Sequence, residues 1–271
     1  MAINKETVLE FYKGYDEDVR ASKSRYNMTE FRSTERILKR YFSGLEAAPR
    51  VIELGCATGH YAYSLAPDCE SYTGVDLSPD NIAVFEKKLA EKPLSCKSSK
   101  PVVCMTGDAT NLCEIPDASF DAVLCLGPMY HLPPEERAKV FAECRRIAVP
   151  GGLLAFSYIN AIGVVAGASC FQSLRGIYPN AEANYCAFEL GHDDLRPDLF
   201  FFTSPEEMEA AALRAGLEKL GNYGLDFFFA ADQLNEIEDE RLPSFLELLD
   251  RMTDSPSCVG LSNHGLLVCK K

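Results

Sequence analysis

Small residues cluster directly after an apolar run near residue 50. Residues 51–59 read Val-Ile-Glu-Leu-Gly-Cys-Ala-Thr-Gly, which is typical of a buried strand that turns through a tight loop into a helix. Small side chains let backbone N–H groups approach a ligand closely, and the N-terminus of the following helix favours negative charge. The loop is therefore predicted to bind a ligand through its backbone.

The spacing of these residues distinguishes between ligand classes. A dinucleotide fingerprint reads G-x-G-x-x-G, but counted from Gly55 the second glycine would fall on Ala57 and the third on His60. The loop reads G-x-A-x-G instead. It closely resembles motif I of the class I methyltransferases, acidic-x-G-x-G-x-G, with Glu53 as the acid and Ala57 in place of the middle glycine. We expect the methyl group of Ala57 to narrow the loop without abolishing binding. The resemblance implies S-adenosyl-L-methionine as methyl donor and S-adenosyl-L-homocysteine as product.

Two acidic residues follow later strands in the order that this resemblance requires. Asp76 lies 21 residues after Gly55, at the tip of the next predicted strand, where an acid can accept hydrogen bonds from both ribose hydroxyls of an adenosine ligand. Gly107-Asp108-Ala109 follows the third predicted strand. In the resembled family an acid at this point faces the adenine amino group.

The fourth segment runs from Phe120 to Leu132 and ends its strand in a Gly-Pro turn. It resembles the segment after strand 4 of small-molecule methyltransferases and lacks the Asn/Asp-Pro-Pro-Tyr/Phe motif of enzymes that methylate base amines. Over the four segments, the resemblance implies that the cofactor is bound by Glu53, Gly55, Cys56, Ala57, Gly59, Asp76, Leu77, Asn81, Gly107, Asp108, Ala109, Leu126 and Gly127.

Tyr130 and His131 are the candidate catalytic residues, because they follow the fourth strand near the point to which the methyl group should be directed. The leaving group of a sulfonium departs neutral, so a base is needed only where the acceptor is protonated in solution. His131 can take a proton near neutral pH; a packing or helix-capping role is the alternative. His192 is a further candidate for the acceptor pocket, with exposed loop polarity as its alternative. Metal-ligand spacing is absent, so we predict no metal.

Strands alternating with helices must position these segments. Strands are expected at 50–54, 71–76, 102–106, 120–126, 153–158, 218–225 and 265–269, and helices after the glycine loop, after Ser78, at 134–148, from Ser204 to Gly216 and at 241–252. The pattern predicts an α/β fold with helices on both faces of the sheet. The resemblance further implies that this α/β fold is a Rossmann-like, doubly wound, mostly parallel seven-stranded sheet with a helical N-terminal extension and an insertion after strand 5.

Composition argues for a cytoplasmic protein that acts on small molecules. A net charge of −13 and the lack of a basic tract disfavour a nucleic-acid partner. Neither a run of 18 apolar residues nor the apolar core of a signal peptide occurs, which predicts no membrane span. The 11 cysteines form no C-x-x-C pair and are expected to be reduced. The oligomeric state stays open.

Two segments fall outside the alternating pattern and are predicted to cover the cofactor. Residues 1–45 form the helical extension, and the insertion 159–203 interrupts the methyltransferase domain 46–271. The acceptor pocket is expected to draw on their aromatic residues, which are Tyr12, Tyr15, Tyr26, Phe171, Tyr178, Tyr185 and 200–202. One of Arg20, Arg25 and Arg32 is a candidate partner for the cofactor's carboxylate.

The sequence therefore predicts an S-adenosylmethionine-dependent methyltransferase that transfers a methyl group to a small-molecule acceptor by in-line displacement. Three alternatives remain. The first is a methyltransferase that acts on RNA or protein, which an electropositive groove would indicate. The second is a protein that binds the nucleotide without catalysis. The third is a nicotinamide oxidoreductase, which the G-x-A-x-G spacing disfavours.

Overall fold

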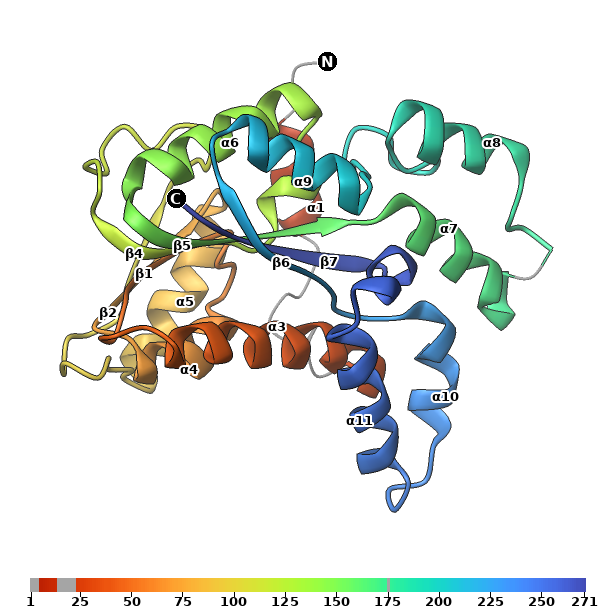
Figure 1. Ribbon diagram of the computed structural model, residues 1–271, viewed down its shortest axis with the longest axis horizontal. Helices are drawn as coiled ribbons and strands as arrows, with labels where there is room; N and C mark the ends of the chain where they lie inside the picture. The colour runs from red at the N-terminus through yellow and green to blue at the C-terminus, as the bar shows by residue number, and fades with distance from the viewer. Residues whose placement is uncertain (1–4, 14–22, 175) are drawn as a thin grey trace.

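The centre of the molecule is a sheet of seven strands in the order β3-β2-β1-β4-β5-β7-β6 (Figure 1). The computed structural model describes residues 5–13, 23–174 and 176–271. The strands in these parts of the chain are β1 Arg50–Leu54, β2 Ser71–Asp76, β3 Val103–Thr106, β4 Phe120–Cys125, β5 Ala148–Ile159, β6 Glu218–Gly224 and β7 His264–Lys270. Only β7 runs antiparallel, between β5 and β6, which confirms the predicted mostly parallel seven-stranded sheet.

Helices cover both faces of this sheet because neighbouring residues of each buried strand point to opposite sides. Val51 of β1 packs with α3 (Arg25–Ser43), α4 (His60–Leu65) and α5 (Pro79–Glu91). Ile52 packs on the other face with α6 (Pro134–Ile147) and α9 (Pro205–Arg214). Figure 1 shows these two layers, with α10 (Ala231–Glu236) and α11 (Leu242–Thr253) extending away from the sheet. Because β2, β1 and β4 are parallel neighbours, their carboxyl ends lie side by side at one end of the strands.

Several helix starts follow from local chemistry that the sequence displays. The side chain of Ser78 accepts a hydrogen bond from the backbone of Asn81 at the start of α5. Ser204 and Glu207 form a capping box at the start of α9, where the sequence predicts a helix to begin. Of the helical extension predicted for residues 1–45, α1 spans Lys5–Lys13, and residues 1–4 and 14–22 on either side of it lie outside the described part of the chain.

The insertion contains more regular structure than its sequence suggests. It holds α7 (Ala161–Cys170), α8 (Ala181–Tyr185) and the short helices η3 (Gln172–Leu174) and η4 (Cys186–Leu190). The two glycines of α7 permit close packing: a Cβ at Gly163 would lie 1.8 Å from the Ser262 carbonyl oxygen, and one at Gly167 would lie 2.1 Å from the Phe228 ring. Because α7 itself consists of small and apolar residues on every side, it has no distinct hydrophobic stripe, and the periodicity that marks other helices is absent.

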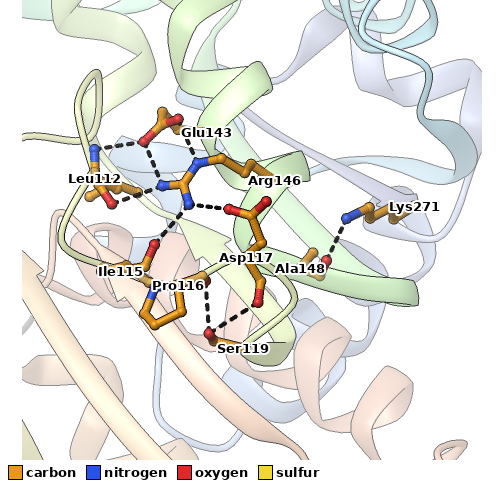
Figure 2. Close-up of polar contacts among 9 residues, drawn as sticks. All are labelled: Leu112, Ile115, Pro116, Asp117, Ser119, Glu143, Arg146, Ala148 and Lys271. Atoms are coloured by element: carbon orange, nitrogen blue, oxygen red, sulfur yellow. Dashed lines mark hydrogen bonds and ion pairs between the residues drawn. The ribbon is translucent and has the colours of Figure 1, made fainter.

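Helix α6 holds the long connection between β3 and β4 in place (Figure 2). The Arg146 guanidinium donates hydrogen bonds to the carbonyls of Leu112 and Ile115 and pairs with Asp117 and Glu143. Glu143 in turn accepts a hydrogen bond from the Leu112 amide at 2.7 Å. Both polar groups of the Leu112 backbone are thus satisfied by one helix, which anchors the chain just after the predicted adenine segment.

Candidate functional site

Glycine is required where the β1 loop meets the segment after β4. Gly55 has a φ of +81°, and a Cβ at this residue would lie 2.6 Å from Cδ of Pro128 and 2.9 Å from the Leu126 carbonyl oxygen. Gly59 begins α4 with a φ of +86°, and its Cβ would clash with the Phe85 ring at 2.2 Å. The loop can therefore keep its shape and its neighbours only with glycine at these two positions.

Ala57 stands in the left-handed region, with a φ of +45°. Alanine rarely adopts this conformation, because its Cβ approaches the backbone too closely. Ala57, which replaces the middle glycine of the motif, is therefore strained, because it is held in a conformation that glycine adopts without strain. The Ala57 amide donates a hydrogen bond to Oδ2 of Asp76 at 2.8 Å, which ties the loop to the end of β2.

Asp76 receives hydrogen bonds from two loops. Besides Ala57, the Ser78 amide and the Asn81 side chain donate to its Oδ1 at 2.8 and 3.3 Å. Burial raises the pKa of Asp76, against the lowering effect of these hydrogen bonds. The carboxylate is thus fixed in orientation while it lines the pocket.

Glu53 is a buried acid that favours its protonated form. It is 1% exposed, and the Tyr72 hydroxyl donates to its Oε2 at 2.6 Å. Burial, with a smaller contribution from the charge of Asp76, raises the pKa of Glu53 to about 8, although the Tyr72 hydrogen bond lowers it. Its Oε1 has no hydrogen-bond partner among the described residues, and Glu53 lines the pocket.

Asp108 is held by its own turn and by the N-terminal helix. Both the amide and the hydroxyl of Thr110 donate to its Oδ1 at 2.8 Å, and Lys5 of α1 forms an ion pair with its Oδ2. Burial opposes ionisation, but the Lys5 and Thr110 contacts prevail and lower the pKa of Asp108. The predicted adenine acid is therefore ionised and already linked to α1.

The segment after β4 brings the predicted catalytic residues to the same pocket. Gly127 has a φ of +132°, and its amide donates to Oγ of Ser157 at 3.0 Å. The following short helix η2 (Pro128–His131) carries Tyr130 and His131, both buried and both lining the pocket. Nδ1 of His131 lies 2.9 Å from the Leu199 carbonyl oxygen. Since a carbonyl only accepts, Nδ1 carries a proton.

The other ring nitrogen of His131 faces the N-terminal helix. Nε2 lies 2.9 Å from the Tyr12 hydroxyl. With Nδ1 protonated, Nε2 of the neutral ring accepts the hydrogen bond that Tyr12 donates. His131 is thus oriented at both nitrogens, with its acceptor directed toward a tyrosine that also lines the pocket.

The three acids Glu53, Asp76 and Asp108 line the same pocket as Tyr12, Tyr130 and His131, and this pocket encloses about 1240 Å³ of space with its open mouth included. Every residue that the resemblance assigns to the cofactor lines it, except Gly59, which lies behind the loop against Phe85. Lys5, Glu30, Phe31 and His60 also line it. Sequence reasoning missed these four: Lys5, Glu30 and Phe31 lie on helices without a recognisable motif, and His60 follows the glycine loop as the first residue of α4.

Other predicted acceptor residues lie elsewhere. His192, Phe171, Tyr178 and Tyr185 are not among the residues that line this pocket. Phe200 instead packs on His131, with the ring centroids 5.3 Å apart. The insertion therefore supports the pocket wall from behind.

The arginines predicted for the cofactor's carboxylate have other partners where the structure describes them. Arg25 pairs with Asp239, and Arg32 pairs with Asp250. Arg20 and Tyr15 lie outside the described residues. Within the described ranges there is neither a group of three or more His, Cys, Asp or Glu suited to a metal ion nor a helix long and apolar enough to cross a membrane.

Comparison with known proteins adds three findings. Residues 52–156 match a family model described as a methyltransferase domain. A ubiquinone biosynthesis O-methyltransferase from Methylococcus capsulatus is 31% identical over 114 residues, which cover 42% of this chain and 45% of that protein. A protein of the same name from Paracidovorax citrulli is 26% identical, over 66% of this chain and 67% of its own.

A solved structure covers almost the whole chain. Magnesium protoporphyrin IX methyltransferase from Synechocystis, with bound SAH, has a TM-score of 0.63 at 13% identity and covers 99% of this chain and 100% of its own. This similarity concerns the fold. The chain spans less than half of the Methylococcus relative and about two thirds of the Paracidovorax one.

Proposed function

We propose that this chain, whose residues 52–156 match a methyltransferase domain, transfers a methyl group from S-adenosylmethionine to a hydroxyl oxygen of a small molecule. One observation carries the proposal: the motif loops of β1, β2 and β3 and the Tyr12–His131 pair line the same pocket. A ligand held by the first set therefore presents its reactive end to the second.

The residues present fit the cofactor. Asp76 offers a fixed carboxylate to the ribose hydroxyls, and the ionised Asp108 offers an acceptor to the adenine amino group. The unpartnered Oε1 of Glu53 suits an ammonium group, whose charge would favour loss of the Glu53 proton. Lys5 and the Gly107–Thr110 turn border the adenine side of the pocket.

When bound, the cofactor supplies a methyl group on a sulfonium that leaves as a neutral thioether. The chain's own task is then alignment and removal of one proton. An acceptor hydroxyl that donates to the Tyr12 oxygen loses its proton to Tyr12 as the Tyr12 proton passes to Nε2 of His131. The Leu199 carbonyl holds the other nitrogen and stabilises the resulting imidazolium. Tyr130 lies beside His131, at a ring distance of 4.8 Å, and shapes the wall at this point.

The N-terminal segment 1–45 acts as a cover in this proposal, and residues 46–271 form the cofactor-binding domain. The side chains of Lys5, Val8, Leu9 and Tyr12 line the pocket from α1. Phe11 packs on Phe200 of the insertion, with ring centroids 5.8 Å apart. The cover thus excludes water directly through α1 and indirectly through the insertion 159–203.

A small acceptor is supported by the names of the curated relatives and by charge. The protein carries a net charge of −13, and Lys5 is the one Lys or Arg among the described residues that line the pocket, already paired with Asp108. Such a pocket does not attract a phosphate backbone. All 11 cysteines are free, which suits the reducing cytoplasm that we propose as its location.

Two measurements test the proposal in sequence. Calorimetric titration should detect binding of S-adenosylmethionine and S-adenosylhomocysteine, with no binding of NADH. Methyl-labelled cofactor should then label hydroxylated small molecules. Label in RNA or in protein would favour the alternative acceptors, and cofactor binding without any transfer would indicate a non-catalytic binding protein.

A further inference from the structure

Arg137 is a buried cation in the first turn of α6, next to the segment that carries Tyr130 and His131. The residue is 6% exposed. Burial lowers the pKa of Arg137 to about 10, with the charge of Glu207 opposing the shift, so the guanidinium is charged at neutral pH. A buried charge is costly unless hydrogen bonds replace its hydration, and the partners of Arg137 therefore matter to the structure around it.

Those partners are backbone carbonyls from two separate segments. Nε donates to the carbonyl oxygens of Met129 and Leu132 at 3.0 and 2.8 Å, and Nη2 donates to that of Phe202 at 3.3 Å. Met129 and Leu132 flank Tyr130 and His131 in the chain, whereas Phe202 belongs to the end of the insertion. The guanidinium thus holds both ends of the site segment and connects them to the insertion.

The same two segments meet directly beside the pocket. The Phe201 amide donates to the Tyr130 carbonyl at 2.8 Å, and the Leu199 carbonyl faces Nδ1 of His131. Movement of either segment would break these bonds and leave the guanidinium without its acceptors. A planar guanidinium can serve diverging acceptors at once, which a lysine ammonium on a flexible stem does not reproduce.

We propose that Arg137 is a positioning residue that sets the orientation of His131 by fixing the segment after β4 against residues 199–202. This inference rests on the proposed function, since it assumes that His131 takes part in methyl transfer. The insertion then influences the reaction through Arg137 and Leu199, without lining the pocket. The Leu199 carbonyl accepts the hydrogen bond from Nδ1 and thereby leaves Nε2 to Tyr12.

The protonation pattern of His131 is a direct test that needs no acceptor. The chain has four histidines, so nitrogen NMR of histidine-labelled protein can resolve each ring, and the spectrum of His131→Asn identifies the His131 signals. In the native protein we expect one neutral form, protonated at Nδ1. In Arg137→Lys we expect loss of this single form in favour of a mixture of both tautomers, while S-adenosylhomocysteine affinity stays within about twofold.

Arg146→Met is the matched control, because it removes an arginine from the same helix that also binds backbone carbonyls, at the opposite end of α6. It should leave the His131 signals unchanged. Arg137→Met is the stronger variant, and Arg137→Lys keeps the test decisive if Arg137→Met fails to fold. An unchanged His131 tautomer in folded Arg137→Lys would overturn the proposal, as would the same change in Arg146→Met. Neither result depends on whether the cofactor's methyl group is transferred.

Discussion

The hydroxyl of Tyr12 lies 2.9 Å from Nε2 of His131, although 119 residues separate them in the chain. The contact joins α1 to the segment after β4, and both residues line the pocket. In the proposed mechanism this pair is the proton acceptor, and its two residues come from two elements, one of which belongs to the proposed cover.

Replacement of either partner should slow methyl transfer more than it weakens cofactor binding. We expect Tyr12→Phe and His131→Gln each to lower kcat by about 10²-fold, the lower end of what a positioned base contributes. The double variant should be little slower than either single variant, because the two residues act as one unit. Steady-state kinetics with labelled cofactor measures all three. Losses that multiply in the double variant would mean that the residues act independently.

Asp76→Ala should weaken cofactor binding without unfolding the protein. Loss of a charged acceptor of hydrogen bonds costs about 1.5–3 kcal/mol, or roughly tenfold to hundredfold in affinity. Calorimetric titration with S-adenosylhomocysteine gives the affinity, and circular dichroism monitors the fold. Asp80→Ala is the control, since Asp80 is an exposed acid at the start of the following helix, α5, and does not line the pocket. Equal affinities for the two variants would mean that the ribose lies elsewhere.

Ala57→Gly should stabilise the protein. Glycine removes the cost of the left-handed conformation, about 1–2 kcal/mol. About half of this gain is offset because glycine has more conformational entropy to lose on folding. We expect the free energy of unfolding to rise by about 0.5–1 kcal/mol in urea denaturation. Ala118→Gly, at a φ of +51° and away from the pocket, should stabilise similarly. If Ala57→Gly alone destabilises the protein, the loop conformation described above is wrong.

Glu53 should make stability depend on pH. Its pKa is raised from 4.5 to about 8, so the folded protein retains a proton that the unfolded chain releases above about pH 4.5. The resulting stabilisation is complete below that pH and is lost as pH rises toward 8, by up to about 1.4 kcal/mol per pH unit. Glu53→Gln cannot ionise, so the difference in unfolding free energy between native and variant protein should shift in favour of the variant from pH 5 to pH 8. A constant difference would show that Glu53 is ionised throughout.

Some features of the fold could be predicted from the sequence, and others could not. The glycine loop, Asp76 and the Ser204 capping box were predictable because each depends on residues close together in the chain. The mostly parallel sheet was predictable because buried runs and helices alternate along the chain. No helix was predicted at α7, because Gly163 and Gly167 serve close packing against residues far away in sequence, and local propensity cannot reveal such a partner.

Of the residues that line the pocket, the sequence predicted mainly those assigned to the cofactor. Lys5 gives no local signal, and its ion pair with Asp108 spans 103 residues. Tyr12 was recognised as an aromatic residue of the cover, but its alignment with His131 depends on how α1 packs over the sheet. Arg137 looks like any surface residue of a charged helix, and its burial follows from the insertion that folds over it.

The most direct test of the central claim is to incubate the purified protein with methyl-labelled S-adenosylmethionine and the small-molecule fraction of a cell extract. The products are then separated from added RNA and protein. We predict label in small molecules as methyl ethers, together with release of S-adenosylhomocysteine, and loss of both signals in Asp76→Ala. Label confined to RNA or protein, or no label from a protein that binds the cofactor, would contradict the proposed function.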